Sequence, residues 1–251
     1  MPLLALWGCG DCEDMDMGQL PLKGELQEFI PPIVSGHQLT YNGVSSPVQY
    51  EVYNGPDDEL VQGKLTGDKE LRGKLLKYEC SEYYTIETEY FKTYIDSKDF
   101  ELNVEVVHSK NVDPVDNNSF NRVEDVDDVL KFSLGYSNSF PETIKVQNQS
   151  YSSYTPVRTF IFSLHPERTI VASGAHKFAN RIVQEYLPSL TINGVTHEGV
   201  YHLYLESPQF TGIEHELYEL YPFTYVQGIY VKSGAGLLRV YTSAGENIDF
   251  H

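Results

Sequence analysis

The stretch that decides the fold class is "LTINGVTHEGVYHLYLES", residues 190 to 207. Asn193-Gly194 suits a tight type I′ hairpin turn, because both residues tolerate positive φ. After the turn, apolar and polar side chains alternate with the period of two that is typical of a strand. The two faces of this predicted strand carry Val200, His202 and Tyr204 on one side and Tyr201, Leu203 and Leu205 on the other.

The same pattern continues in "FTYVQGIYVKSGAGLLRVYTSAGENIDFH", residues 223 to 251. Two alternating segments meet at "SGAG", residues 233 to 236, and "SAGE", residues 243 to 246, turns the chain once more into "NIDF". Glycine and serine are common in such tight turns. The C-terminal part therefore reads as a meander of antiparallel strands.

Most of the preceding chain also reads as strands bounded by turns. The pair at 82–94 and 99–110 indicates two long neighbouring strands, the second with Phe100, Leu102, Val104 and Val106 on one face. "HKFANRIVQEYL", residues 176 to 187, fits a helical spacing about as well as a strand, and we expect one short helix there. Shorter predicted strands lie within 46–55, 129–136, 143–148 and 157–164. The sequence thus predicts a mainly β fold, an antiparallel β-sandwich or a strongly curved meander sheet, with at most one or two short helices.

Composition narrows the possible functions. Of the 251 residues, 41% are hydrophobic and 13% aromatic, which is enough for a packed core. The formal charge of -18 argues against binding nucleic acid or an anionic membrane surface, because both require clustered Lys and Arg. Since the chain has no apolar run of about 18 residues, it lacks a transmembrane helix, and we expect any membrane link to be an anchor.

The N-terminal stretch "LLALWGCGDCEDMDMG", residues 3 to 18, contains two of the three cysteines, Cys9 and Cys12. A redox C-x-x-C normally opens a helix that lowers the thiol pKa, whereas this one is followed by acids. A zinc site would need two more ligands, and only Cys80 and scattered histidines are available. Both interpretations are weak.

A third interpretation is a bacterial lipoprotein signal. Leu6, Trp7, Gly8 and Cys9 stand where a lipobox places Leu, a small or apolar residue, Gly and the lipidated Cys. We therefore expect residues 1–8 to be the remnant of a signal segment, although its apolar run is short and it lacks basic residues. Residues 9–30 would form an acidic tether, leaving a single β-rich domain at 31–251 with a possible subdivision near the acidic loop 111–128. The alternative is a frayed N-terminus without a role.

The C-terminal pattern also resembles uncharacterised envelope lipoproteins of Bacteroidota. The residues that carry the resemblance specify hairpin geometry; they are Ile192, Asn193, Gly194, Val200, Tyr201, Tyr230, Gly234, Gly236, Leu237, Gly245 and Phe250. The family's signal peptide is complete and basic at its start, unlike the one here. The resemblance implies lipidation at Cys9 and an acidic tether associated with display on the outer surface, and it brings no catalytic residues.

Other candidate sites are weaker. The loop 111–128 gathers acids that could hold Ca²⁺, but it lacks the D-x-D-x-D-G pattern, so a solvated loop is favoured. No H-E-x-x-H motif is present, and we expect no metal and no cofactor. Four tyrosines close in sequence could form an aromatic binding cluster, although tyrosine is also an ordinary filler of half-exposed strand positions. They are Tyr218, Tyr221, Tyr225 and Tyr230.

Two hypotheses of function follow. The first is a lipid-anchored cell-envelope protein, non-catalytic, that serves as a binding or structural module of the outer membrane or periplasm, with a glycan or an unknown envelope component as its partner. The second is a hydrolase acting on glycans through carboxylates that are dispersed in the sequence. A deep pocket with two carboxylates about 5 to 10 Å apart would favour the hydrolase.

Overall fold

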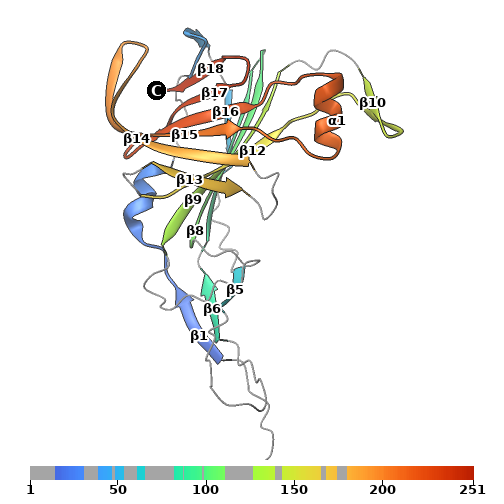
Figure 1. The fold of residues 1–251 in the computed structure, drawn as a ribbon. Coiled ribbons are helices and arrows are strands. Elements are labelled where there is room, and N and C mark those ends of the chain that lie inside the picture. Colours follow the sequence, from blue (N-terminus) through green and yellow to red (C-terminus); the bar gives the residue numbers. More distant parts are fainter. Residues whose placement is uncertain are drawn as a thin grey trace, which may run out of the picture.

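The computed structural model describes residues 15–30, 39–46, 49–53, 61–65, 82–86, 88–97, 99–110, 127–138, 143–164, 168–173 and 180–251. Two large antiparallel sheets dominate it, as the sequence predicts (Figure 1). Neither helix in this described part has the length and apolar character that crossing a membrane requires.

The larger sheet has eight strands and contains the whole C-terminal meander. Its order is β13 (Thr169–Ser173), β14 (Asn180–Ile192), β15 (Val195–Ser207), β16 (Val226–Lys232), β17 (Gly236–Thr242), β18 (Asn247–Phe250), β2 (Leu39–Tyr41) and β3 (Val44–Ser46). The predicted turn between β14 and β15 is confirmed, with φ of 51° at Asn193 and 81° at Gly194. The turns before β17 and β18 are likewise confirmed.

The smaller of the two sheets has five strands. Its order is β12 (Val157–Phe162), β9 (Asp128–Ser137), β8 (Glu101–Lys110), β7 (Glu89–Asp96) and β4 (Gln49–Tyr53). Strands β7 and β8 pair from Glu89 opposite His108 to Asp96 opposite Glu101, which confirms the two long neighbours. Because β8 pairs with β9 up to Lys110 and Asp128, the acidic loop joins two partners of one sheet and does not divide the domain there.

The two sheets bury one shared core between them, so the architecture is a β-sandwich. The four apolar positions predicted on one face of 99–110 are all buried: Leu102, Val104 and Val106 on β8, and Phe100 just before it. The eight-stranded sheet contributes Tyr201, Leu203 and Leu205 to the same core. This confirms the predicted alternation from Tyr201 to Leu205, because His202 and Tyr204 on the other face are partly exposed and outside this core. Val200, predicted on the same face as His202, is instead buried in a small separate cluster.

The N-terminal segment enters the sandwich earlier than the sequence suggests. The short 3₁₀ helix η1 (Gly24–Phe29) buries Leu26 and Phe29 in the main core. The Phe29 ring lies 4.8 Å from Phe162 of the five-stranded sheet and 5.8 Å from Tyr201 of the eight-stranded sheet. The expected tether therefore cannot extend to residue 30, because two apolar side chains within it are worth more buried than solvated.

The helix expected at 176–187 is wrong. From Asn180 onward this segment is part of β14, which pairs with β15 over almost its full length. Ile182 and Val183 are buried, and Gln184 forms two hydrogen bonds with the backbone of Ser163 near the end of β12. Cross-strand pairing thus overrides an ambiguous local period. The described α-helix is instead α1 (Ile213–Leu220).

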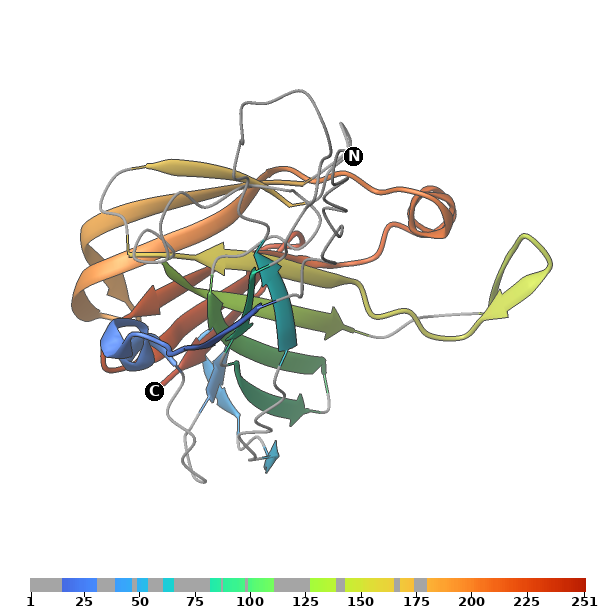
Figure 2. The same ribbon diagram turned by 90° about the horizontal axis from the view of Figure 1, so that it is seen from below.

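Two small sheets complete the described structure. One consists of β1 (Met15–Leu20), β6 (Glu82–Ile86) and β5 (Val61–Leu65), with β1 and β6 parallel. The other is the hairpin of β10 (Ile144–Val146) and β11 (Gln149–Tyr151), which extends away from the sandwich (Figure 2). Helix α1 contacts β10, and Gln147 at the hairpin turn donates a hydrogen bond to Glu216 of α1.

Candidate functional site

A row of polar and aromatic residues crosses the outer face of the eight-stranded sheet. The register places Glu185 of β14, His202 of β15, Tyr230 of β16, Arg239 of β17 and Asp249 of β18 directly opposite one another in turn. Directly opposite residues of antiparallel strands lie on the same face. These five residues, here called the outer row, therefore lie on one face of the sheet across five strands, where Asp249 is buried and the other four are partly exposed.

The centre of the outer row is a stack of aromatic rings. The His202 ring lies 4.3 Å from Tyr230 at an interplanar angle of 10°, and 4.6 Å from Tyr204 at 25°. Tyr241 closes the group, with its hydroxyl 2.8 Å from His202 Nε2. Stacked rings restrict one another's rotamers, so we expect this surface to lose little side-chain entropy when a ligand binds.

His202 is uncharged at neutral pH. Burial lowers its pKa to about 4, and the nearby Glu185 carboxylate only partly opposes this. Burial also raises the pKa of Tyr230 and of Tyr241, which keeps both hydroxyls protonated. The centre of the outer row is therefore a neutral surface with hydroxyl and imidazole groups.

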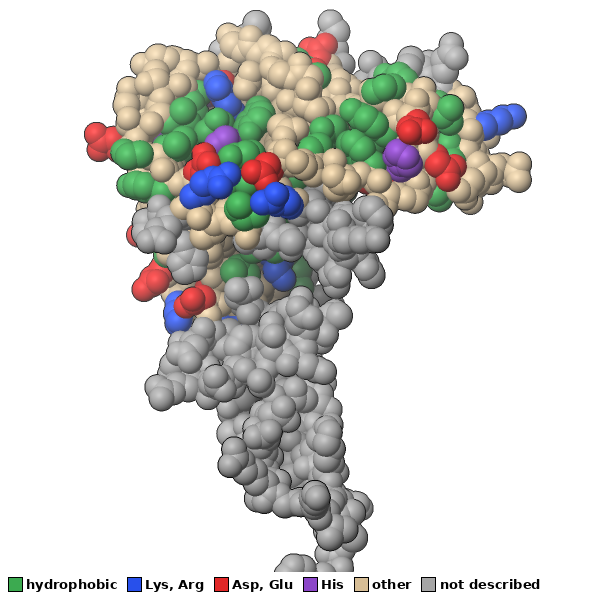
Figure 3. Space-filling view, viewed as in Figure 1, with side chains coloured by type: hydrophobic (Ala, Val, Ile, Leu, Met, Phe, Trp, Pro, Cys, Tyr) green, Lys and Arg blue, Asp and Glu red, His purple; other side chains and the backbone are tan. Residues whose placement is uncertain are grey.

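Paired charges border this neutral centre on both sides. At one end Arg168 binds Glu185 at 2.9 Å, and this hydrogen bond holds the pKa of Glu185 below its usual range. At the other end Arg239 Nε binds Asp249 at 2.5 Å. Figure 3 shows acidic and basic side chains side by side over β13 and β14, next to hydrophobic side chains. The charges of the row therefore cancel in pairs.

The long hairpin of β14 and β15 bends over the far end of the row (Figure 1). At its tip Asn193 Nδ2 donates a 2.7 Å hydrogen bond to Asp249. Near the tip, Ile192 and Val200 form a small separate core with Leu238, against which Tyr230 packs. The eight-stranded sheet is thus strongly curved, and its outer face is partly covered at one end.

The structure divides the four predicted tyrosines between two places. Tyr230 belongs to the outer row, whereas Tyr218 and Tyr225 pack with Phe210 and Phe223 where α1 meets the sandwich. Tyr225 is buried, so it cannot present its ring to a ligand. Tyr221 is partly buried against the main core. The prediction of a single site is therefore wrong, because Tyr218 and Tyr225 pack with Phe210 and Phe223 whereas Tyr230 stacks on His202.

Arg158 lies at the centre of the aromatic cluster formed by Phe210, Tyr218, Phe223 and Tyr225 where α1 meets the sandwich. Its guanidinium lies 5.2 Å from the Phe210 ring and 5.2 Å from the Tyr225 ring, and it binds Glu214 of α1 at 2.8 Å. Burial raises the pKa of the neighbouring Tyr154 to about 12, with the charge of Glu214 adding to the effect. This arrangement attaches α1 to β12 through a buried charge, and we interpret it as structural.

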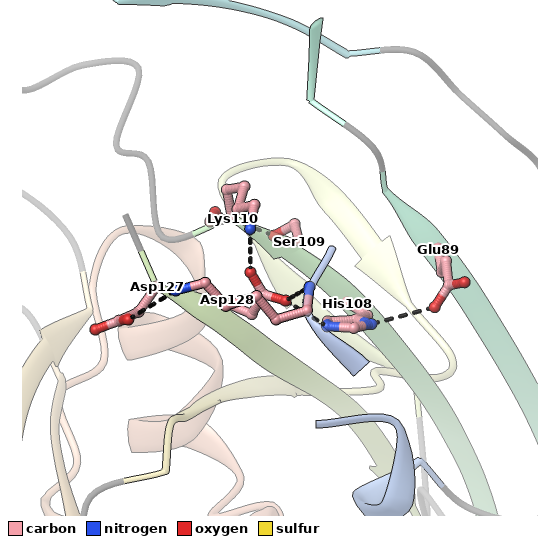
Figure 4. A network of polar contacts seen from close by, with 7 residues as sticks. Glu89, His108, Ser109, Lys110, Asp127 and Asp128 are labelled. Carbon is pink, nitrogen blue, oxygen red and sulfur yellow. Dashed lines mark hydrogen bonds and ion pairs between the residues drawn. The ribbon is translucent and has the colours of Figure 1, made fainter. Parts of the chain in front are cut away.

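A second buried ionic network lies where β8 and β9 leave the sheet (Figure 4). Asp128 accepts a 2.6 Å hydrogen bond from Lys110 Nζ, and its other oxygen accepts one from the backbone N–H of Lys23. His108 Nδ1 lies 3.1 Å from Glu89, and His108 Nε2 lies 3.3 Å from Asp128 without forming a hydrogen bond. These contacts join three segments of the chain around one carboxylate.

A small pocket of about 130 Å³ lies beside this network. Typical ligand pockets measure roughly 300 to 1,000 Å³, so this one is too small for a sugar ring and its catalytic groups. Asp128 is moreover engaged by Lys110 and Lys23 and is not a free acid or base. The pocket is lined by Lys23, Glu25, Leu26, Asp127, Asp128, Ser163 and Leu164.

Some sequence-based expectations concern residues that the structure does not describe. Cys9, Cys12, Cys80 and the loop 111–126 lie outside the described residues. Among the described residues, no group of three or more His, Cys, Asp or Glu side chains is arranged to hold a metal ion.

Comparison of the chain with protein-family models, with curated proteins and with solved structures found no match. The assignment of function therefore depends on the residues themselves.

Proposed function

We propose that the protein is a lipid-anchored, non-catalytic binding module of the bacterial cell envelope, and that its outer row binds a glycan. The observation that carries the binding role is the stack of His202 with Tyr204 and Tyr230 on the outer face of the sheet. The anchor is inferred from the sequence at Leu6 to Cys9 and from the acidic residues that follow.

The chemistry of the outer row favours a neutral ligand rich in hydroxyl groups. Aromatic rings offer apolar contact to the C–H groups of a sugar, and the phenol and imidazole groups at their edges can exchange hydrogen bonds with sugar hydroxyls. Because Arg168 and Arg239 are each paired with a carboxylate, no net charge is left to select a phosphate or another anion. An acidic chain with this surface is better suited to a neutral glycan.

Binding can be tested by affinity electrophoresis through gels that contain starch, xylan or soluble peptidoglycan, one at a time. We expect at least one polysaccharide to retard the wild-type protein, and Tyr230→Ala to lose that retardation. Tyr221→Ala is the matched control, because Tyr221 lies away from the outer row against the main core. Equal retardation of both variants, or none for the wild type, would overturn the glycan assignment.

The anchor can be tested separately by metabolic labelling with an alkynyl fatty acid in cells that make the protein from its own gene. We expect the wild type and Cys12→Ser to be labelled and Cys9→Ser to lose the label. Cys12 is a fitting control because it lies three residues further along the same segment. An unlabelled wild type would contradict the lipoprotein assignment.

The glycan hydrolase is the alternative for which the structure offers one relevant observation, the carboxylates of Asp127 and Asp128 at the small pocket. We favour binding over hydrolysis because Asp128 is held by Lys110 and by the Lys23 backbone, and Asp127 by Lys23 Nζ at 3.6 Å. Release of reducing sugar from a polysaccharide that retards the protein would support the hydrolase instead.

A further inference from the structure

The segment of residues 23–30, here called the strap, closes one end of the sandwich. It inserts Leu26 and Phe29 between the two sheets, with Phe29 in ring contact with both Phe162 and Tyr201. The strap thus contacts both sheets with one aromatic side chain.

Apart from the burial of Leu26 and Phe29, the hydrogen bonds between the strap and the sandwich are concentrated near the two ends of the strap. At its start the backbone N–H of Lys23 binds Asp128, and near its end the Glu28 carbonyl accepts a 2.7 Å hydrogen bond from Gly234 N–H while the Glu28 carboxylate binds Ser233. The N-cap position of η1 makes no side-chain hydrogen bond. A short 3₁₀ helix without a side-chain N-cap has weak intrinsic stability, so the strap depends on these contacts and on the burial of Leu26 and Phe29 to stay in place.

Asp128, which accepts the hydrogen bond at the start of the strap, belongs to a buried ionic network. Asp128 is 4% exposed and Lys110 5%, and His108 is fully buried beside them. The groups that face Asp128 are Lys110, His108 and the Lys23 backbone, with Glu89 on the far side of His108 and Asp127 next to it in sequence (Figure 4). Removing the carboxylate would leave buried donors unpaired, which weakens the strap at its start.

The space beneath the strap is not tightly packed. The pocket of about 130 Å³ lies between Lys23, Glu25 and Leu26 on the strap and Asp127, Asp128, Ser163 and Leu164 on the sandwich. Polar groups line it on both sides, so water can occupy the space when the strap lifts. Opening can therefore begin at the polar contacts of Lys23, whereas complete release also requires Leu26 and Phe29 to leave the core.

We propose that residues 23–30 are a releasable strap, fastened by Asp128, whose release uncovers the apolar end of the core between Phe162 and Tyr201. The strap opens while both sheets stay folded, because the strand pairs of β8 with β9 and of β14 with β15 do not include it.

Native-state hydrogen exchange followed by mass spectrometry tests the strap in the wild-type chain. We expect the amides of residues 23–30 to exchange faster than those of β8 and β15, and their exchange to depend little on low concentrations of urea, as is typical of a local opening. Exchange of the strap at the rate of β8, with the same urea dependence, would overturn the proposal, because the strap would then open only when the whole domain unfolds.

The variant Asp128→Asn tests the fastening. We expect it to accelerate exchange of the strap by more than about tenfold while β14 to β16 keep their wild-type protection. Glu105→Gln is the matched control, because it removes a carboxylate from the exposed pair with Lys92 on neighbouring strands of the same sheet. Uniform acceleration over all peptides in Asp128→Asn would show a general loss of stability and would contradict a local fastening. Neither experiment depends on Cys9, so failure of the anchor leaves both results interpretable.

Discussion

The imidazole of His202 lies 4.3 Å from the ring of Tyr230 with only 10° between the planes, and the Tyr241 hydroxyl is 2.8 Å from its Nε2. Three strands thereby bring together residues that are up to 39 positions apart in the sequence. The stack is enclosed enough that burial lowers the pKa of His202 to about 4. This relationship determines both the proposed binding surface and its response to pH.

The depressed pKa of His202 predicts a loss of stability in mild acid. Between about pH 6.5 and pH 4 the unfolded chain binds a proton at this histidine and the folded chain does not, so the free energy of unfolding falls as the pH falls through this window. The loss attributable to His202 is up to about 3 kcal/mol at pH 4. Urea unfolding of the wild type and of His202→Phe from pH 4 to 7.5 measures it. The variant should show a smaller pH dependence in this window, and parallel curves would contradict the assignment.

The close approach of Tyr241 to Gly228 predicts that any side chain at this position lowers the stability of the fold. A Cβ at Gly228 would lie 2.4 Å from the Tyr241 hydroxyl oxygen and 2.7 Å from the backbone oxygen of Leu203. We expect Gly228→Ala to lower the free energy of unfolding by about 1 to 3 kcal/mol and to displace Tyr241 from His202. Thermal unfolding measures the loss. Gly24→Ala is the control, since a Cβ there has no atom within 4 Å; an equal effect of the two substitutions would refute the steric explanation.

The buried guanidinium of Arg158 predicts that α1 depends on one side chain. Arg158→Met would leave Glu214 without its partner and remove the cation between Phe210 and Tyr225. We expect a loss of about 2 to 4 kcal/mol, with the amides of α1 exchanging faster than those of β12. Hydrogen exchange of the two elements checks this. If α1 kept its wild-type protection, the apolar contacts of the helix would be sufficient without the charge.

At the tip of the long hairpin, we expect Asn193 to contribute to the stability of the fold in two separable ways. This residue has a φ of 51° and donates a hydrogen bond to Asp249. Asn193→Gly keeps the turn conformation and loses the hydrogen bond, so we expect a loss of about 0.5 to 1.5 kcal/mol. Asn193→Ala also places a side chain with Cβ in the left-handed region, which costs roughly 1 to 2 kcal/mol more. Urea unfolding of both variants compares them, and a less stable Gly variant would contradict this order.

Local sequence patterns were sufficient to predict the structure where a strand has one buried face or a turn needs glycine. The alternation along 201–205 predicted which side of β15 enters the core, and Asn193-Gly194 predicted the turn before it, because side-chain period and backbone φ are local properties. The same reasoning failed at 176–187, where the apolar residues fitted a helix and a strand equally well. Pairing with β15 makes this segment a strand from Asn180 onward. It also missed α1, whose attachment to Arg158 joins positions 56 residues apart.

At the candidate site, local patterns predicted even less, and contacts between distant segments determined more. The sequence by itself determined that His202 and Tyr204 share a face of one strand and that the chain is acidic and rich in tyrosine. Only the tertiary structure decided that Tyr230 stacks on His202 while Tyr218 of α1 and Tyr225 pack with Phe210 and Phe223, and that Leu26 and Phe29 close the core. Register between strands and contacts between sheets depend on which distant segments pair, and one sequence read for local periodicity does not specify those pairs.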